Sequence, residues 1–142
     1  MRNSNEILME SPMPATRLEH FTVRCEDLQR TRDFYCEIVG LTEGQRPNLP
    51  FRGFWLYAGE VPVVHLMDKA EAEKIAGESP CDDPHTAALD HVAFSAEDLT
   101  GTRSLLQAHG YEFRENSIPG FLDQIFLRDP DGILVELNFR AG

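Results

Sequence analysis

The sequence predicts an α+β fold built from two copies of one βαβββ module. The first supporting observation is an internal repeat, because the stretch from Leu18 resembles the stretch from Leu89. The second is alternation of apolar and polar residues, which is typical of half-buried strands. The third is a helical apolar face after the first strand of each copy, ending at Gly40 or Gly110.

The repeat aligns chemically similar residues in the two halves. At the spacing that relates Leu18 to Leu89, His20 aligns with His91 and His65 aligns with Glu136. Further pairs at the same spacing are Glu26 with Glu97, Asp27 with Asp98, Thr31 with Thr102, and Arg32 with Arg103. A duplicated unit of this length predicts two structural copies of one motif.

The first module is expected over residues 17–67. Alternating residues predict a strand over Leu18–Arg24, and Asp27 is the expected N-cap of the helix that follows. The apolar face of this helix consists of Leu28, Thr31, Phe34, Tyr35 and Ile38. Three more strands are expected, over residues 41–45, 53–58 and 61–67.

The second module is expected over residues 89–142. It begins with a strand over Leu89–Ser95, and Asp98 is the expected N-cap of its helix. The apolar side of this helix consists of Leu99, Thr102, Leu105 and Leu106. Three strands follow, over residues 111–116, 121–128 and 132–139, with a Pro-Asp-Gly turn before the last.

The segments outside the modules are expected to connect rather than to pack. Residues 1–16 are polar and predict a flexible tail, and residues 68–88 are acidic with two prolines and predict a linker. Two modules can pair into one larger curved mixed sheet with the helices outside and a concave ligand-binding face. The long linker permits pairing within one chain or a swapped homodimer.

Composition restricts the possible partners. The chain of 142 residues has a formal net charge of −11, which argues against nucleic acid as a partner. No apolar run approaches the roughly 20 residues of a membrane-spanning helix, and no secretory signal is present, so a cytoplasmic protein is expected. The three cysteines are widely spaced and predict neither a disulfide framework nor a metal clip.

Strand alternation predicts a metal site on the concave face. If Val92, Phe94, Val135 and Leu137 pack against the helices, the residues between them point inward. This places His91 and Glu136 on the concave face, and the repeat places His20 and His65 there too. Three imidazoles and one carboxylate suit one divalent metal ion, Zn, Ni, Fe or Mn. The alternative is a metal-free polar pocket.

Other residues on the same face are candidates for contacting a small-molecule substrate. Gln124, Phe126 and Arg128 share one strand face, and Trp55 aligns with Phe126 in the repeat. Trp55 would form an aromatic wall of the pocket. Ordinary sheet packing is the alternative for each of these four residues.

Three motifs carry a resemblance to a known group. They are Asp-Leu-Gln-Arg-Thr-Arg-Asp-Phe-Tyr at 27–35, Leu-Asp-His-Val-Ala-Phe at 89–94 and Arg-Asp-Pro-Asp-Gly-Ile-Leu-Val-Glu-Leu at 128–137. The chain thereby resembles the vicinal oxygen chelate superfamily, which includes glyoxalase I, bleomycin-resistance proteins and extradiol dioxygenases. The resemblance implies the glyoxalase/bleomycin-resistance fold, with a metal bound by His20, His91, Glu136 and, at a fourth place, His65.

The resemblance also implies a chemistry. The first expectation is a lyase or isomerase that chelates a small oxygenated substrate to the metal and stabilises an enediolate or alkoxide. Glu136 is the implied base, and His65 is either the fourth ligand or the base, whereas glyoxalase I typically has Glu there. The alternatives are an Fe(II) dioxygenase, although Phe126 replaces the Tyr of those enzymes, and a protein that sequesters a small molecule. Small members of the group often form homodimers.

Overall fold

The first half of the chain forms a four-stranded sheet with two helical segments. The computed structural model describes residues 15–76 and 89–140. The strands of this half are β1 (Phe21–Cys25), β2 (Thr42–Gly44), β3 (Gly53–Ala58) and β4 (Val61–Asp68). The helices are α1 (Leu28–Asp33), which continues as the π-helix η1 (Phe34–Ile38), and α2 (Lys69–Ala76).

The second half repeats this order. Its strands are β5 (Val92–Ala96), β6 (Arg114–Ile118), β7 (Leu122–Arg128) and β8 (Leu134–Phe139), and its helix is α3 (Leu99–Ala108). The sheet orders are β1-β4-β3-β2 and β5-β8-β7-β6. The parallel pairs are β1 with β4 in the first sheet and β5 with β8 in the second. The predicted α+β fold with two βαβββ units is therefore confirmed.

The helix caps follow the sequence prediction. The Asp27 carboxylate accepts a hydrogen bond from the Arg30 backbone N–H at 3.1 Å, and the Asp98 carboxylate accepts one from Gly101 at 3.0 Å. These bonds satisfy backbone donors that have no partner inside the helix. Both helices therefore begin where their acidic caps predict.

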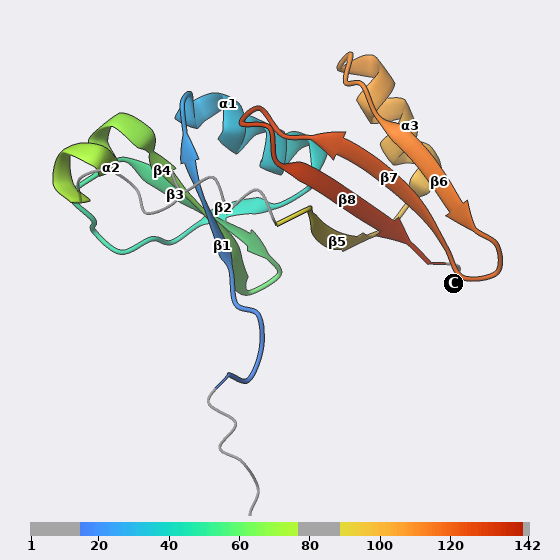
Figure 1. Ribbon diagram of the computed structural model, residues 1–142, viewed down its shortest axis with the longest axis horizontal. Coiled ribbons are helices and arrows are strands. Elements are labelled where there is room, and N and C mark those ends of the chain that lie inside the picture. The colour runs from blue at the N-terminus through green and yellow to red at the C-terminus, as the bar shows by residue number, and fades with distance from the viewer. Residues whose placement is uncertain (1–14, 77–88, 141–142) are drawn as a thin grey trace, which may run out of the picture.

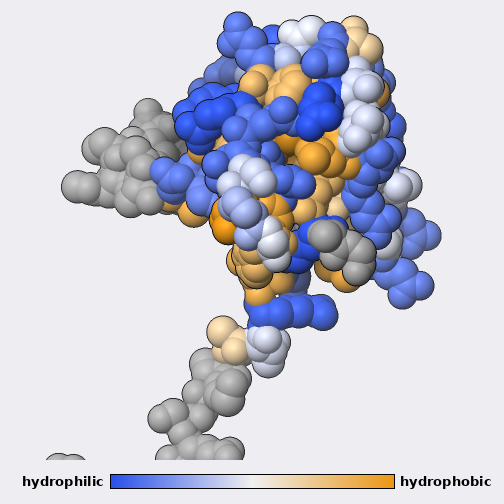
Figure 2. Space-filling model, turned by 90° about the vertical axis from the view of Figure 1, so that its right-hand side faces the viewer, coloured by the Kyte–Doolittle hydropathy of each residue, from blue (hydrophilic) through white to orange (hydrophobic). Residues whose placement is uncertain are grey.

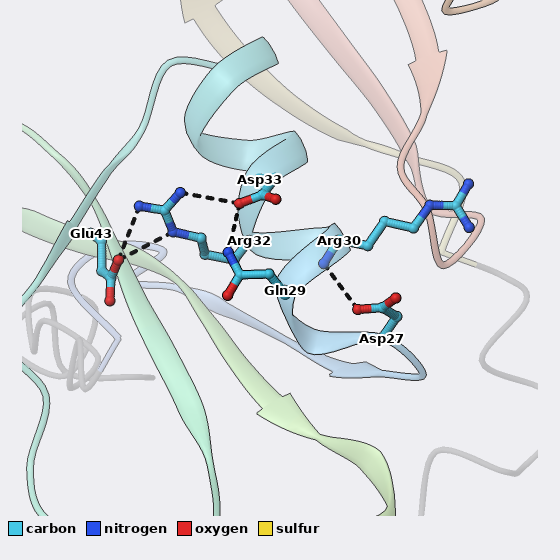
Figure 3. A network of polar contacts seen from close by, with 6 residues as sticks. All are labelled: Asp27, Gln29, Arg30, Arg32, Asp33 and Glu43. Carbon is cyan, nitrogen blue, oxygen red and sulfur yellow. Dashed lines mark hydrogen bonds and ion pairs between the residues drawn. The ribbon is translucent and has the colours of Figure 1, made fainter.

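Ion pairs fix α1 against the edge of the first sheet. The Arg32 guanidinium donates to the Glu43 carboxylate at 3.0 Å and to Asp33 at 3.2 Å (Figure 3). Glu43 belongs to β2, the edge strand of the sheet. The exposed side of α1 is thus attached to β2, while Leu28 and Thr31 point into the core.

The two sheets are neighbours that do not merge (Figure 1). Among the described residues, no strand of the first sheet is paired with a strand of the second. The edge strands β1 and β5 approach each other through Phe21 and Phe94, whose ring centroids are 6.2 Å apart. The chain therefore forms two four-stranded sheets, and the single curved sheet expected from edge pairing is not closed within it.

The modules are joined on the helical side by two polar contacts, one buried and one partly buried. The Tyr35 hydroxyl of η1 donates to the Asp129 carboxylate in the β7–β8 turn at 2.7 Å. The Thr31 hydroxyl donates to the Asp131 carboxylate at 2.5 Å. Burial raises the pKa of Tyr35 above its ordinary value, so the hydroxyl remains protonated and can donate. These bonds fix the first module against the turn of the second.

Replacing Tyr35 with Phe is expected to lower the free energy of unfolding by about 1–3 kcal/mol, because Asp129 then loses a buried donor. Urea denaturation measures the change. Tyr57→Phe is the matched control, since the Tyr57 hydroxyl donates to the Gln45 carbonyl at 2.6 Å in an exposed position. Equal losses in both variants would contradict a special role for the Tyr35 contact.

Some elements differ from the sequence prediction. Residues 69–76 of the expected linker form α2. The Asp68 carboxylate caps the N-terminus of this helix, because it accepts a hydrogen bond from the Glu71 backbone N–H at 3.0 Å. In the second module, the strand predicted to start at Tyr111 is β6, and it starts at Arg114. The expected tail up to residue 14 and the linker from 77 to 88 lie outside the described residues.

The surface contains hydrophobic areas as well as charge. Figure 2, which views the molecule from the side of the second module, shows orange hydrophobic areas among blue hydrophilic ones. In that module the Phe121 side chain is 60% exposed and Ile118 is 44% exposed. In the part of the chain that the structure describes, no helix has the length and hydropathy of a membrane span.

Candidate metal site

The first sheet brings His20 and His65 together on the face opposite its helices. His20 directly precedes β1, and His65 lies on β4 between the core residues Val64 and Leu66. The two imidazole rings stack with centroids 3.7 Å apart and an interplanar angle of 13°. We call His20 and His65 the histidine pair.

The environment of His65 favours its neutral form. Burial lowers the pKa of His65 below 6.5, and the neighbouring His20 lowers it further. Its Nε2 lies 3.2 Å from the Pro62 carbonyl oxygen, which accepts only if Nε2 carries the proton. The Nδ1 lone pair of His65 is then available to bind a cation.

The second sheet brings His91 and Glu136 together at the equivalent positions. His91 directly precedes β5, Glu136 lies on β8, and His91 Nε2 is 3.0 Å from Glu136 Oε2. The Gln124 side-chain amide on β7 donates to Oε1 of Glu136. Glu136 is only 7% exposed. We call His91 and Glu136 the histidine–glutamate pair.

Asp90 orients His91 from the other side of its ring. The Asp90 carboxylate lies 2.7 Å from His91 Nδ1. This hydrogen bond is the main reason that the pKa of His91 is raised above 6.5, and the charge of Glu136 adds to the effect. A carboxylate on the far nitrogen of a metal-binding histidine is a common arrangement, because it fixes the ring and its tautomer.

Replacing Asp90 with Asn is expected to weaken metal binding by about 10–100-fold and to shift pH-dependent metal release to higher pH. A metal binds neutral imidazole, so protons compete at and below the pKa of His91. Losing the Asp90 carboxylate leaves the ring less fixed and less basic, and the resulting loss of metal affinity outweighs the weaker competition from protons. Metal content after dialysis between pH 5 and 8 measures the shift. Asp123→Asn, on the same sheet, is the control, and an unchanged release profile for Asp90→Asn would refute the role of Asp90.

The four predicted ligands form two pairs within one chain. Among residues 15–76 and 89–140, no three His, Cys, Asp or Glu side chains are close enough together to hold a metal ion. The chain thus brings His20 to His65 and His91 to Glu136, but it does not bring the two pairs together. Each pair lies on an open sheet face, and a largely buried carboxylate such as Glu136 fits a cation.

Three of the four predicted substrate-contacting residues adjoin these pairs. The Trp55 ring stacks on His65 with centroids 3.9 Å apart. Gln124 contacts Glu136, and the Phe126 ring centroid is 6.4 Å from that of His91. Arg128 donates to the Gly132 carbonyl at 2.9 Å, and it lines with His91 a cavity of about 560 Å³ rather than contacting either pair.

Three residues near the pairs were not predicted from the sequence. Asp90 was overlooked although it is adjacent to His91. Arg24 follows Thr22 on the open side of β1, so strand alternation could have identified it. Arg46 lies in the irregular segment between β2 and β3, for which alternation makes no prediction.

Comparisons with known proteins agree with this architecture. The model of the Glyoxalase/Bleomycin resistance protein/Dioxygenase superfamily matches residues 17–137. Glyoxylase I 4 of Arabidopsis thaliana is 28% identical over 137 residues, covering 89% of this chain and 72% of that protein. The crystal structure of a glyoxalase/dioxygenase from Nostoc punctiforme superposes with a TM-score of 0.71 at 17% identity, covering 94% of this chain and 97% of the other.

A similar fold occurs in a binding protein. The crystal structure of TnmS3, an antibiotic binding protein from Streptomyces, has a TM-score of 0.64 and 21% identity, and the match covers 92% of this chain and 100% of the other. The fold therefore occurs in proteins with different kinds of function, so the choice of function depends on the site residues.

Proposed function

Because the chain belongs to the Glyoxalase/Bleomycin resistance protein/Dioxygenase superfamily, we propose that it is a metal-dependent lyase or isomerase acting on a small oxygenated molecule. The metal is held by His20, His91 and Glu136, with His65 as the fourth ligand. The metal is Zn, Ni, Fe or Mn, all of which accept nitrogen and oxygen ligands. Similarity to Glyoxylase I 4 supports the proposed reaction class.

The observation that carries the proposal is the histidine–glutamate pair on an open sheet face. A carboxylate with 7% exposure is costly to keep charged without a positive partner. Its partners among the described residues are His91 and the Gln124 amide. A divalent cation would compensate the charge of Glu136 and bind His91 through the same Nε2 that now faces the carboxylate.

A second copy of the chain would complete the site. Each pair alone supplies two ligands, whereas a zinc site, for example, uses three or four protein ligands. In a two-fold dimer, the histidine pair of one chain faces the histidine–glutamate pair of its partner, and two identical sites result. The contacts of Tyr35 and Thr31 with the β7–β8 turn support this arrangement, because they hold the modules of one chain together on the helical side and leave the open faces for the partner.

The side chains divide the proposed reaction between them. When bound, the metal supplies Lewis-acid stabilisation of negative charge on substrate oxygens. Glu136 accepts the substrate proton at Oε2, while Gln124 holds Oε1 and so fixes the plane of the carboxylate. Neutral His65 keeps a lone pair at Nδ1 for the cation. His20 stacks on one face of its ring, and Trp55 covers the other face.

Sequestration of a small molecule is the second candidate. The rings of Trp55, His65 and His20 stack in one column, and the outer faces of Trp55 and His20 offer aromatic surfaces for a planar ligand. The similar fold of an antibiotic binding protein agrees with such a role.

Metal analysis of protein purified without added metal tests the proposal. Stoichiometric Ni, Zn or Mn supports the lyase or isomerase, whereas oxygen-sensitive Fe(II) would favour the dioxygenase. Protein that takes up none of these metals, even after incubation with each, would rule out both enzymes and favour sequestration. His91→Ala is the site control, and full metal content in this variant would contradict the ligand assignment.

A further inference from the structure

Next to the histidine pair, the open face of the first sheet carries a second cross-strand row. In the row of His65, that residue lies opposite Thr22 on one side and Trp55 on the other. Two residues further along, Met67 lies opposite Arg24 on β1 and Gly53 on β3. Rows on one face of a sheet are about 7 Å apart.

Arg46 extends this second row through Gly53. A Cβ atom placed on Gly53 would lie 3.0 Å from Arg46 Nη2 and 3.2 Å from Nε, so the guanidinium lies against the glycine. The Arg46 side chain also donates to the Phe51 carbonyl at 2.7 Å, and its guanidinium carbon lies 5.2 Å from the centroid of the Phe51 ring. Arg24 and Arg46 thus lie at the two ends of one row, with Met67 and Gly53 between them, and we call them the arginine pair.

The arginine pair has unused hydrogen-bond donors. Arg24 Nη1 and Arg46 Nε are buried and have no hydrogen-bond partner among the described residues. Within the same residues, neither guanidinium forms an ion pair with a carboxylate. Buried donors of a charged group are costly to leave unpaired, so a bound acceptor would be strongly favoured.

The neighbouring Arg52, unlike the arginine pair, is paired with carboxylates. It directly precedes Gly53, and it donates to Glu71 at 2.7 Å and to Asp68 at 3.1 Å. In a chain with a formal net charge of −11, carboxylates are plentiful, yet they pair with Arg52 and not with the arginine pair.

We propose that the substrate carries an anionic group, a carboxylate or a phosphonate, that binds to Arg46 and Arg24. This inference rests on the proposed function, because it places the anionic group about 7 Å from the row of His65 and hence beside the metal. Guanidinium groups form charge-assisted, often bidentate hydrogen bonds with such anions. The substrate is therefore an oxygenated small acid, with its anionic group a few bonds from the oxygens that the metal binds.

Trp55 provides the readout for a binding experiment. It is the only tryptophan of the chain and lies in the neighbouring row, so its fluorescence reports ligands on this face. Benzoate, phenylphosphonate and neutral benzamide are titrated into the full-length protein at constant ionic strength. The two anions distinguish carboxylate from phosphonate, and at least one should bind about tenfold or more tighter than benzamide.

Variants of the two arginines test the assignment. Arg46→Gln and, independently, Arg24→Gln should each weaken the preferred anion by about tenfold or more and leave benzamide unchanged. Arg52→Gln is the matched control, and it should bind the anion as the wild type does. Equal affinity of wild type for the anions and benzamide, or equal behaviour of Arg46→Gln and Arg52→Gln, would overturn the inference.

Metal content of the same samples separates the two proposals. If the protein binds metal but neither arginine substitution changes its affinity for the anion, only the anion site is contradicted. Protein that binds no metal but still prefers anions through Arg46 and Arg24 contradicts only the proposed metal-dependent function.

Discussion

Replacing Glu136 with Gln is expected to reduce metal affinity by about a hundredfold or more while leaving the chain folded. Outer-shell changes already cost about 10–100-fold in metal affinity, and this change removes one of the proposed ligands. An amide is a weak ligand for these metals, and Gln keeps the size of the side chain and its hydrogen bonding to Gln124. The loss would therefore be specific to the metal.

Stability distinguishes a functional residue from a structural one at this position. Without metal, the Glu136 carboxylate is 7% exposed and pairs with His91, whose side chain is 37% exposed, so the neutral amide should change the free energy of unfolding of the metal-free protein by about 1 kcal/mol or less. Metal titration gives the affinity, and urea denaturation with and without chelator gives the stability. Glu115→Gln on β6 is the control, since Glu115 pairs with Arg103 at 2.8 Å away from the site. A destabilised metal-free Glu136→Gln protein with normal metal affinity would assign Glu136 a structural role.

The repeat predicts the fold because pairing within a module depends on local alternation. His65 and Glu136 occupy equivalent positions of the repeat, and the structure gives them equivalent cross-strand neighbours. His65 lies opposite Trp55, and Glu136 lies opposite Phe126, which is the same aromatic partner position. Alternation fixes which face a residue occupies, because a shift of one residue would turn every apolar side chain outward.

Contacts between the modules could not be predicted in this way. Alternation shows that the four ligand candidates share open faces, but it does not determine which open face meets which. The contact between Tyr35 and Asp129 depends on η1, a π-helix that alters the helical period after Asp33. The Arg46 contact depends on Gly53 lacking a side chain in an irregular segment, which periodicity does not describe.

A mixed dimer of two complementary variants is expected to recover half of the wild-type metal content. One chain carries His20→Ala and His65→Ala, and the other carries His91→Ala and Glu136→Ala. In the swapped arrangement each site takes one pair from each chain, so a mixed dimer has one intact site and one site without ligands. Co-expression with two different affinity tags and sequential purification isolates the mixed dimer. Each variant alone should bind no metal at the site.

A second mixed dimer supplies the control, because the swapped and the in-chain arrangement predict opposite results for it. A mixed dimer of wild type with a chain carrying all four alanine substitutions has one intact pair of each kind, both on the same chain. In the swapped arrangement neither site is complete and the metal content falls to near zero. If the two pairs of one chain instead converge, as in an in-chain arrangement, this dimer retains half of the metal and the complementary dimer retains none. The two measurements together therefore decide whether the site is formed between two chains, as the separation of the histidine pair from the histidine–glutamate pair implies.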